Sequence, residues 1–201
     1  MSALLVALVL AQAPAPTARL LEAIAGNKEP VAAILVLGGQ VDLEVRNAAR
    51  ETPLHLAAER NMRALTRLLL DAGARVRART ATGETALHHA ALHEDATCAR
   101  LLLDAGADPR AQNDHGESAL HWAAYGGNDA VVRLLLERGA DPDAFNLDGN
   151  TPLHGAAAGG YADTVRLLLQ HARGPGLKNL AGKAPADLAR ERGHEAVAEL
   201  F

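Results

Sequence analysis

The tetrapeptide TPLH at residues 52–55 is the first of four related motifs that decide the fold of this chain. The others are TALH at 85–88, SALH at 118–121 and a second TPLH at 151–154, each 33 residues after the last. A degraded copy, APAD at 184–187, keeps the register. A fixed period of this length indicates a solenoid built from repeated units.

The period divides the chain into six units between Arg19 and Phe201, with no insertion or deletion. The units start near residues 14, 47, 80, 113, 146 and 179. In the four units with the full motif, Thr or Ser is a good N-cap, and Pro53 or Pro152 fits the first helical position. A second helix follows, with a Leu triplet as in VVRLLLERGA, and then a polar connection. The pattern predicts two helices and a turn per unit.

One position of the connection is glycine in four units and arginine in an earlier one. Gly83, Gly116, Gly149 and Gly182 share this position, as expected where a tight turn needs positive φ. Because Arg50 takes the same position, we expect a distorted or more mobile turn there, at a cost of roughly 1 kcal/mol.

With its T-P-L-H-x-A signature, the unit resembles the ankyrin repeat, which has two antiparallel helices and a β-turn. The resemblance runs from about Arg19 to the end of the chain. It implies an all-α ankyrin-repeat solenoid with β-turn or hairpin fingers, whose end units lack the motif as solenoid caps do. It also implies a non-catalytic protein-binding module that needs no cofactor and is a monomer. Similar exported bacterial proteins assist a co-exported enzyme or neutralise a toxin.

The histidines divide by their place in the repeat. His55, His88, His121 and His154 occupy the fourth motif position, where ankyrin repeats use the imidazole to bridge backbone groups of adjacent turns. A structural role is therefore predicted for all four.

His89 and His93 lie outside that position. We expect His89 to be a partly buried packing residue bonded to a nearby carbonyl. In the same slot, the large Trp122 is expected to be compensated by the small Gly155 of the next unit. His93, at the end of a first helix, is expected to be exposed. Their i, i+4 spacing leaves a second hypothesis open, a metal or small-ligand site centred on His89 and His93 with Glu94 or Asp95. No metal ligand is assigned in the main interpretation.

Catalytic chemistry has few candidate groups. Ser2 and Ser118 are the only serines, the first in the apolar leader and the second an N-cap. Cys98 aligns with packed positions of the second helix, where a buried thiol is inert. With no nucleophile, acid/base pair and oxyanion site together, we predict no enzymatic activity.

The charge pattern indicates whether nucleic acid is a plausible partner. The formal net charge is −4, and acidic and basic residues are interspersed. Nucleic acid is therefore not an expected partner, since the electrostatic footprint of phosphate binding is missing.

The first residues, MSALLVALVLAQAPAP, contain an apolar stretch that is too short to span a bilayer. Small residues and a Pro/Ala segment follow, as in a cleavable export signal. We predict a signal peptide over 1–13, a linker over 14–18 and a repeat domain over 19–201. Periplasmic or secreted protein is the expectation, with no membrane insertion after removal of the signal. The alternative is a cytoplasmic protein whose apolar N-terminus packs on the end of the domain.

In ankyrin repeats the partner meets the finger tips and the exposed ends of the first helices. The apolar residues of this strip are outside the core pattern and suit binding anchors, unless they only pack on adjacent turns. Its glutamates form a mildly acidic rail. The predicted partner-binding residues are Glu84, Leu92, His93, His115, Glu117, Tyr125, Phe145, Leu147 and Asp148.

Overall fold

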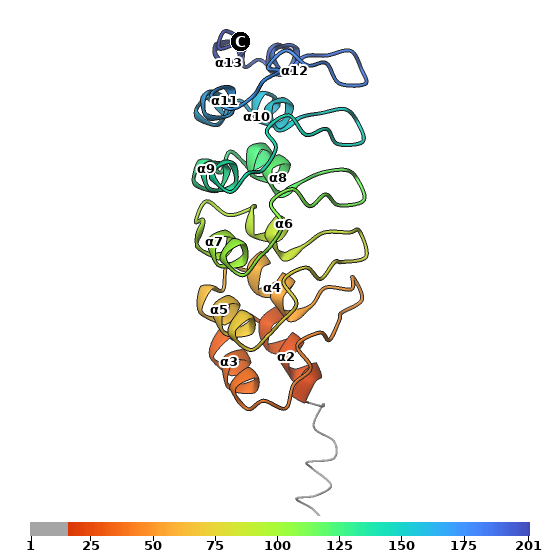
Figure 1. The fold of residues 1–201 in the computed structure, drawn as a ribbon, viewed down its shortest axis with the longest axis vertical. Helices are drawn as coiled ribbons and strands as arrows, with labels where there is room; N and C mark the ends of the chain where they lie inside the picture. Colours follow the sequence, from red (N-terminus) through yellow and green to blue (C-terminus); the bar gives the residue numbers. More distant parts are fainter. Residues whose placement is uncertain (1–15) are drawn as a thin grey trace, which may run out of the picture.

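A computed structural model describes residues 16–201 of the chain. These residues form six antiparallel helix pairs that stack along one axis (Figure 1). The inner layer contains α2 (Pro16–Ala25), α4 (Pro53–Glu59), α6 (Ala86–Ala90), α8 (Ala119–Gly126), α10 (Pro152–Gly159) and α12 (Pro185–Glu191). The outer layer contains α3 (Glu29–Leu37), α5 (Arg63–Asp71), α7 (Thr97–Asp104), α9 (Asp129–Glu137), α11 (Ala162–Leu169) and α13 (Glu195–Ala198).

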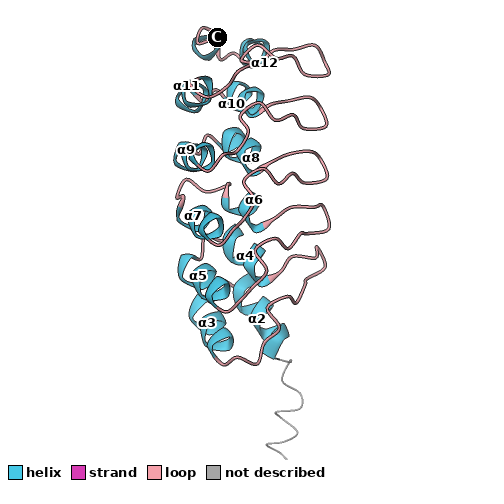
Figure 2. Ribbon diagram, in the orientation of Figure 1, coloured by secondary structure: helices cyan, strands magenta, loops and turns pink. Residues whose placement is uncertain are grey.

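The predicted all-α solenoid is confirmed. Figure 2 shows helices and loops throughout residues 16–201, and the one isolated β-bridge of this region joins Gln112 and Ser118. None of the helices in this part of the chain has the length and apolar character needed to cross a bilayer. The predicted signal peptide and residues 14 and 15 of the predicted linker lie outside the described residues. Residues 16–18 of that linker belong to α2.

Alanine and leucine build a continuous core between the two helix layers. Alanine pairs such as Ala57 and Ala58 let inner helices approach closely, and leucines such as Leu135 and Leu168 of the outer helices are fully buried against them. Each pair therefore packs on its neighbours, as the repeat requires.

The fingers project from one side of the stack (Figure 1). Each closes with a backbone bond, such as the one from Asn113 N–H to the Glu117 carbonyl at 2.9 Å. Neighbouring fingers are joined as well. The bond from Leu147 N–H to the His115 carbonyl, at 2.9 Å, has counterparts along the stack from Ala81, Asp114 and Leu180.

The Arg50 turn corrects one expectation. Arg50 adopts φ of 60°, and its N–H donates to the Asn47 carbonyl at 2.9 Å, as Gly116 N–H does to Asn113 at 3.0 Å. The turn thus keeps the geometry of the glycine turns and is not distorted. The penalty lies in the left-handed backbone of a residue that has a Cβ atom.

The third unit departs from the others at the end of its inner helix. Asn61, Gly127, Gly160 and Gly193 adopt positive φ at the turn between the two helices, whereas Glu94, in the same slot, does not. In that unit α6 ends at Ala90, earlier than its neighbours, and a wider loop leads to α7 (Figure 1). A residue that disfavours the left-handed region explains this different helix end.

Candidate partner-binding groove

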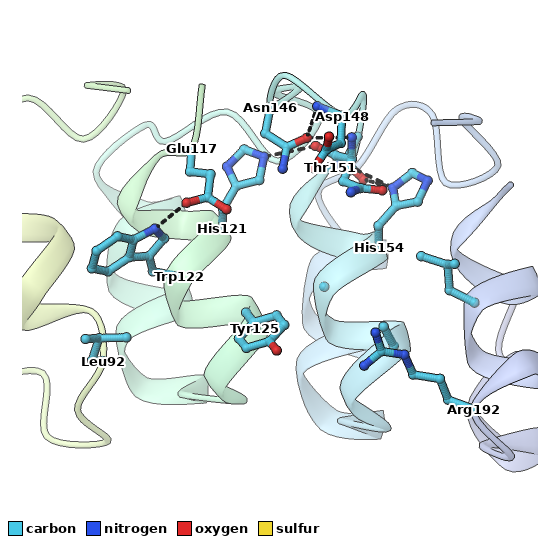
Figure 3. Close-up of a pocket in the computed structure, with 14 residues that line it drawn as sticks. Leu92, Glu117, His121, Trp122, Tyr125, Asn146, Asp148, Thr151, His154 and Arg192 are labelled. Carbon is cyan, nitrogen blue, oxygen red and sulfur yellow. Dashed lines mark hydrogen bonds between the residues drawn. The ribbon is translucent and has the colours of Figure 1, made fainter. Parts of the chain in front are cut away.

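A hollow of about 500 Å³ lies on the inner-helix side of units four to six (Figure 3). Trp122 and Tyr125 of α8 line one side, and Leu188 and Arg192 at α12 line the other. The fingers close the third side. The remaining lining residues are Leu92, Glu117, His121, Asn146, Asp148, Asn150, Thr151, His154, Gly155 and Ala158.

The groove exists because the fifth unit carries small residues between two larger ones. Gly155 occupies the repeat slot of Trp122 in the unit before and of Leu188 in the unit after. Ala158 likewise follows Tyr125 in its slot. Removing two side chains from one layer of a regular stack leaves a depression flanked by apolar walls.

The expected pairing of Trp122 with Gly155 is not the closest contact of the glycine. A Cβ atom on Gly155 would meet the backbone and Cβ of Tyr125 at 3.6 Å, which is ordinary van der Waals contact. The indole of Trp122 is instead held by a polar bond, since its Nε1–H donates to Glu117 Oε2 at 2.9 Å. Trp122 is thereby fixed as a rigid apolar wall with its polar edge satisfied.

Charged groups lie at opposite ends of the groove. Glu117 and Asp148 belong to the finger side, and Arg192 extends from the α12 side toward α10 (Figure 3). An apolar floor with an acidic and a basic end suits one or two apolar side chains of a peptide segment, with polar contacts around them.

The structure gathers only part of the predicted surface in this groove. Leu92, Glu117, Tyr125 and Asp148 line it, whereas five other predicted residues do not. Those five are Glu84, His93, His115, Phe145 and Leu147. The predicted exposure of the apolar residues is confirmed, since Tyr125 is 66% exposed and Leu147 is 68% exposed.

Unit six contributes Leu188 and Arg192 to the groove, and the predicted strip contained no residue of that unit. The strip ended at unit five because unit six lacks the motif. The period itself contained the missing signal, because Leu188 is 33 residues after Gly155 and Arg192 is 33 after Gly159.

His93 corrects a further expectation. Its side chain is half-buried rather than exposed, and its Nε2 lies 2.7 Å from the Glu59 carbonyl at the end of α4. Since α6 has already ended at Ala90, His93 lies in the loop that follows. The helical i, i+4 arrangement with His89 is therefore not formed, and His93 satisfies a helix C-terminus.

The motif histidines bridge units as predicted. The N–H of Thr151 donates to His154 Nδ1 at 3.0 Å, and His154 Nε2 lies 3.1 Å from the Lys183 carbonyl of the next unit. An Nδ1 that accepts and an Nε2 that donates define a neutral tautomer. His55, His88 and His121 repeat this pattern with the carbonyls of Glu84, Glu117 and Asn150.

The neutral state of these histidines follows from their burial. Burial lowers the pKa of both His55 and His88 to about 4, with the neighbouring His89 also lowering both. Burial also lowers the pKa of His121 and of His154. Each motif histidine thus acts as a fixed neutral hydrogen-bond bridge.

The pair Ser118 and His121 resembles a nucleophile with its base, because Ser118 Oγ lies 2.9 Å from His121 Nδ1. The same Nδ1 accepts the Ser118 N–H, and Nε2 is bonded to the Asn150 carbonyl. Both ring nitrogens are therefore occupied by backbone groups, and Ser118 is buried. This pair caps a helix in the same way as its threonine counterparts.

Cys98 is fully buried in α7, as predicted. Burial raises the pKa of its thiol, and the Thr66 hydroxyl lies 3.7 Å from the sulfur. A thiol held protonated in apolar surroundings is a packing group.

The fold also brings together positive charges that lie in separate stretches of the sequence. Five arginines, which are Arg46, Arg50, Arg75, Arg77 and Arg79, line a shallow hollow at the base of the second and third fingers. Two of them serve the fold, because Arg46 and Arg79 donate to finger carbonyls of their own and the next unit. The even mixture of charges along the chain therefore does not hold for this part of the surface.

The fold and the groove define a class of protein, a helical-repeat solenoid with fingers on one side and a groove beside its inner helices. The profile of the family described as "Ankyrin repeats (3 copies)" matches residues 20–113, 82–146 and 120–201. The chain belongs to the ankyrin-repeat family. Proteins of this family are generally protein-protein interaction modules and typically non-catalytic. A search of curated proteins found no match.

Proposed function

We propose that this protein is a non-catalytic binding module that holds a partner protein in the groove of units four to six. The groove of about 500 Å³, with Trp122, Tyr125 and Leu188 on its walls, is the observation that carries the proposal. Exposed aromatic and leucine side chains around a depression are typical binding anchors. The exposed apolar residues Phe145 and Leu147 on the neighbouring finger extend this surface.

The groove favours an apolar anchor residue on the partner, inserted beside Gly155. The partner backbone then lies near Asp148 on one side and Arg192 on the other. The two charges would set the direction of the partner segment in the groove as well as strengthen its binding. In the reversed direction, each charged group of the segment would meet the opposite end of the groove.

Capture of the partner from the native organism tests the proposal. We expect wild-type protein to retain a partner that Tyr125→Ala loses and that Phe145→Ala binds more weakly. Ile34→Ala is the control, since Ile34 is an exposed apolar residue of α3 far along the stack. If both Tyr125→Ala and Phe145→Ala capture the partner as well as the wild-type protein does, the proposed binding surface is wrong.

The apolar N-terminal stretch supports the further proposal that the protein is exported, and that its partner shares that compartment. Two roles fit this location, namely support of an enzyme and neutralisation of a toxin. Mass analysis of the mature N-terminus tests export, and an intact Met1 or Ser2 start would contradict it. Assay of the captured partner, alone and in the complex, separates a stabiliser from an inhibitor.

A further inference from the structure

A second cluster of polar side chains lies between units two and three, apart from the groove. One ring nitrogen of His89 and the carboxylate oxygens of Glu51 and Glu59 all lie within 4.8 Å of one another. Glu84 is adjacent, with its Oε2 3.6 Å from His89 Nε2. One imidazole thus faces three carboxylates, contributed by α4, α6 and two fingers.

His89 is the unusual member of the cluster. Its side chain is only 8% exposed, and its buried Nε2 has no hydrogen-bond partner within the described residues. The equivalent residue of the next unit, Trp122, donates from Nε1 to Glu117 at 2.9 Å. At 3.6 Å, His89 and Glu84 do not form the corresponding bond. A buried polar atom without a partner is costly, and a bound ion removes that cost.

We propose that His89, Glu51 and Glu59 bind a divalent first-row transition metal, and that Zn²⁺ fits best. Imidazole nitrogen combined with carboxylate oxygen is a common zinc ligand set, whereas Mg²⁺ and Ca²⁺ prefer oxygen alone. The proposal does not depend on the partner-binding groove. It also replaces the His89 and His93 pair, since His93 is bonded to the Glu59 carbonyl.

The ligand atoms of His89, Glu51 and Glu59 need to move only slightly closer together to bind zinc. Ligand atoms in a tetrahedral zinc site are about 3.4 Å apart, so a separation of up to 4.8 Å requires the carboxylates to move inward. Glu59 is exposed, which leaves its side chain free to turn. Water or Glu84 would complete the coordination. The bound ion would connect α4 to α6, the inner helix that ends early.

Titration of ZnCl₂ into the full-length, untagged and chelator-treated protein tests this site. Calorimetry should show one saturable equivalent, and the melting temperature should rise with zinc concentration. His89→Leu introduces the residue found in the same slot of unit two and should abolish the saturable equivalent. Glu59→Gln should weaken binding roughly tenfold or more. His115→Ala is the control, because this exposed histidine lies outside the cluster.

Several results would overturn the proposal. One is the lack of a saturable equivalent in the wild-type protein. Another is zinc binding that is unchanged in Glu59→Gln. This variant is expected to fold because Glu59 is exposed, so the test holds even if His89→Leu fails to fold. Loss of binding in His115→Ala would indicate scattered surface sites. Loss in His93→Ala with no effect of Glu51→Gln would favour the histidine pair instead.

Discussion

At the residue scale, the backbone conformation of Arg50 determines the shape of its turn. Arg50 holds the same left-handed conformation and the same turn bond as the glycines of later units. The neighbouring finger explains why an arginine side chain fits at this position. A Cβ atom at Gly83 would meet Asp114, whereas the residue equivalent to Asp114 beside Arg50 is Ala81. The finger of unit two therefore bears backbone strain but leaves room for a side chain.

Arg50→Gly should stabilise the protein by about 1 kcal/mol, because glycine adopts positive φ without the Cβ penalty. Urea unfolding followed by circular dichroism measures the change. The control is Ala49→Gly, at a neighbour with ordinary φ, which should give no stabilisation. A lower unfolding midpoint for Arg50→Gly would contradict this account of the turn.

The motif histidines predict a pH-dependent stability. An unfolded chain binds protons at histidine near pH 6.5, whereas the folded pKa of His55 and of His88 is about 4. The unfolded state therefore binds more protons as pH falls, and stability present above pH 6.5 is lost as pH falls toward 4. Each of the two contributes as much as about 3 kcal/mol.

Urea unfolding with chelator present should show this loss between pH 6.5 and 4. In the folded protein, NMR titration of His121 and His154, which lie away from the proposed metal site, should give pKa values below that of a free histidine. A stability that stays flat over this interval would show that the histidines are not held neutral.

At the element scale, helix ends and small residues shape the surface. Glu94 stands where other units have a left-handed glycine or asparagine, and α6 ends early for that reason. This changes the position of His93 and separates it from His89, with which the alternative hypothesis had paired it. In α10, by contrast, Gly155 lies within a continuous helix, and its missing side chain opens the groove.

Gly155→Ala should stabilise the protein by about 0.5–1 kcal/mol, because alanine favours the helix and its Cβ meets Tyr125 at a comfortable 3.6 Å. Thermal unfolding measures this change. The same methyl group narrows the groove, so partner capture should weaken while stability rises. Destabilisation by this variant would mean that the space beside Tyr125 is smaller than the structure indicates.

At the scale of the whole molecule, stability follows from contacts between neighbouring units. Units two to five each extend a histidine bond to the next unit. Unit one has no motif histidine, and its α3 exposes Ile34 and Leu37. Its polar link to unit two includes the bond from Leu65 N–H to Glu29 at 3.0 Å. The first described unit is thus less firmly held than the centre of the stack.

Native-state hydrogen exchange should therefore show residues 16–45 opening before residues 85–160 as urea increases. The central units, linked on both sides, should retain protection until global unfolding. Simultaneous loss of protection along the stack would show that the histidine bonds do not set the order of opening.

The sequence by itself determined the ankyrin-repeat architecture, the bridging histidines, the buried cysteine and the exposure of Tyr125 and Leu147. These properties repeat every 33 residues or follow from one slot of the unit, so a single chain shows them directly. Only the tertiary structure decided the depth of the groove, the half-buried state of His93 and the carboxylates around His89. The physical reason is that these features combine side chains from two or three units with the exact end of a helix. Their geometry exists only after the units have packed together.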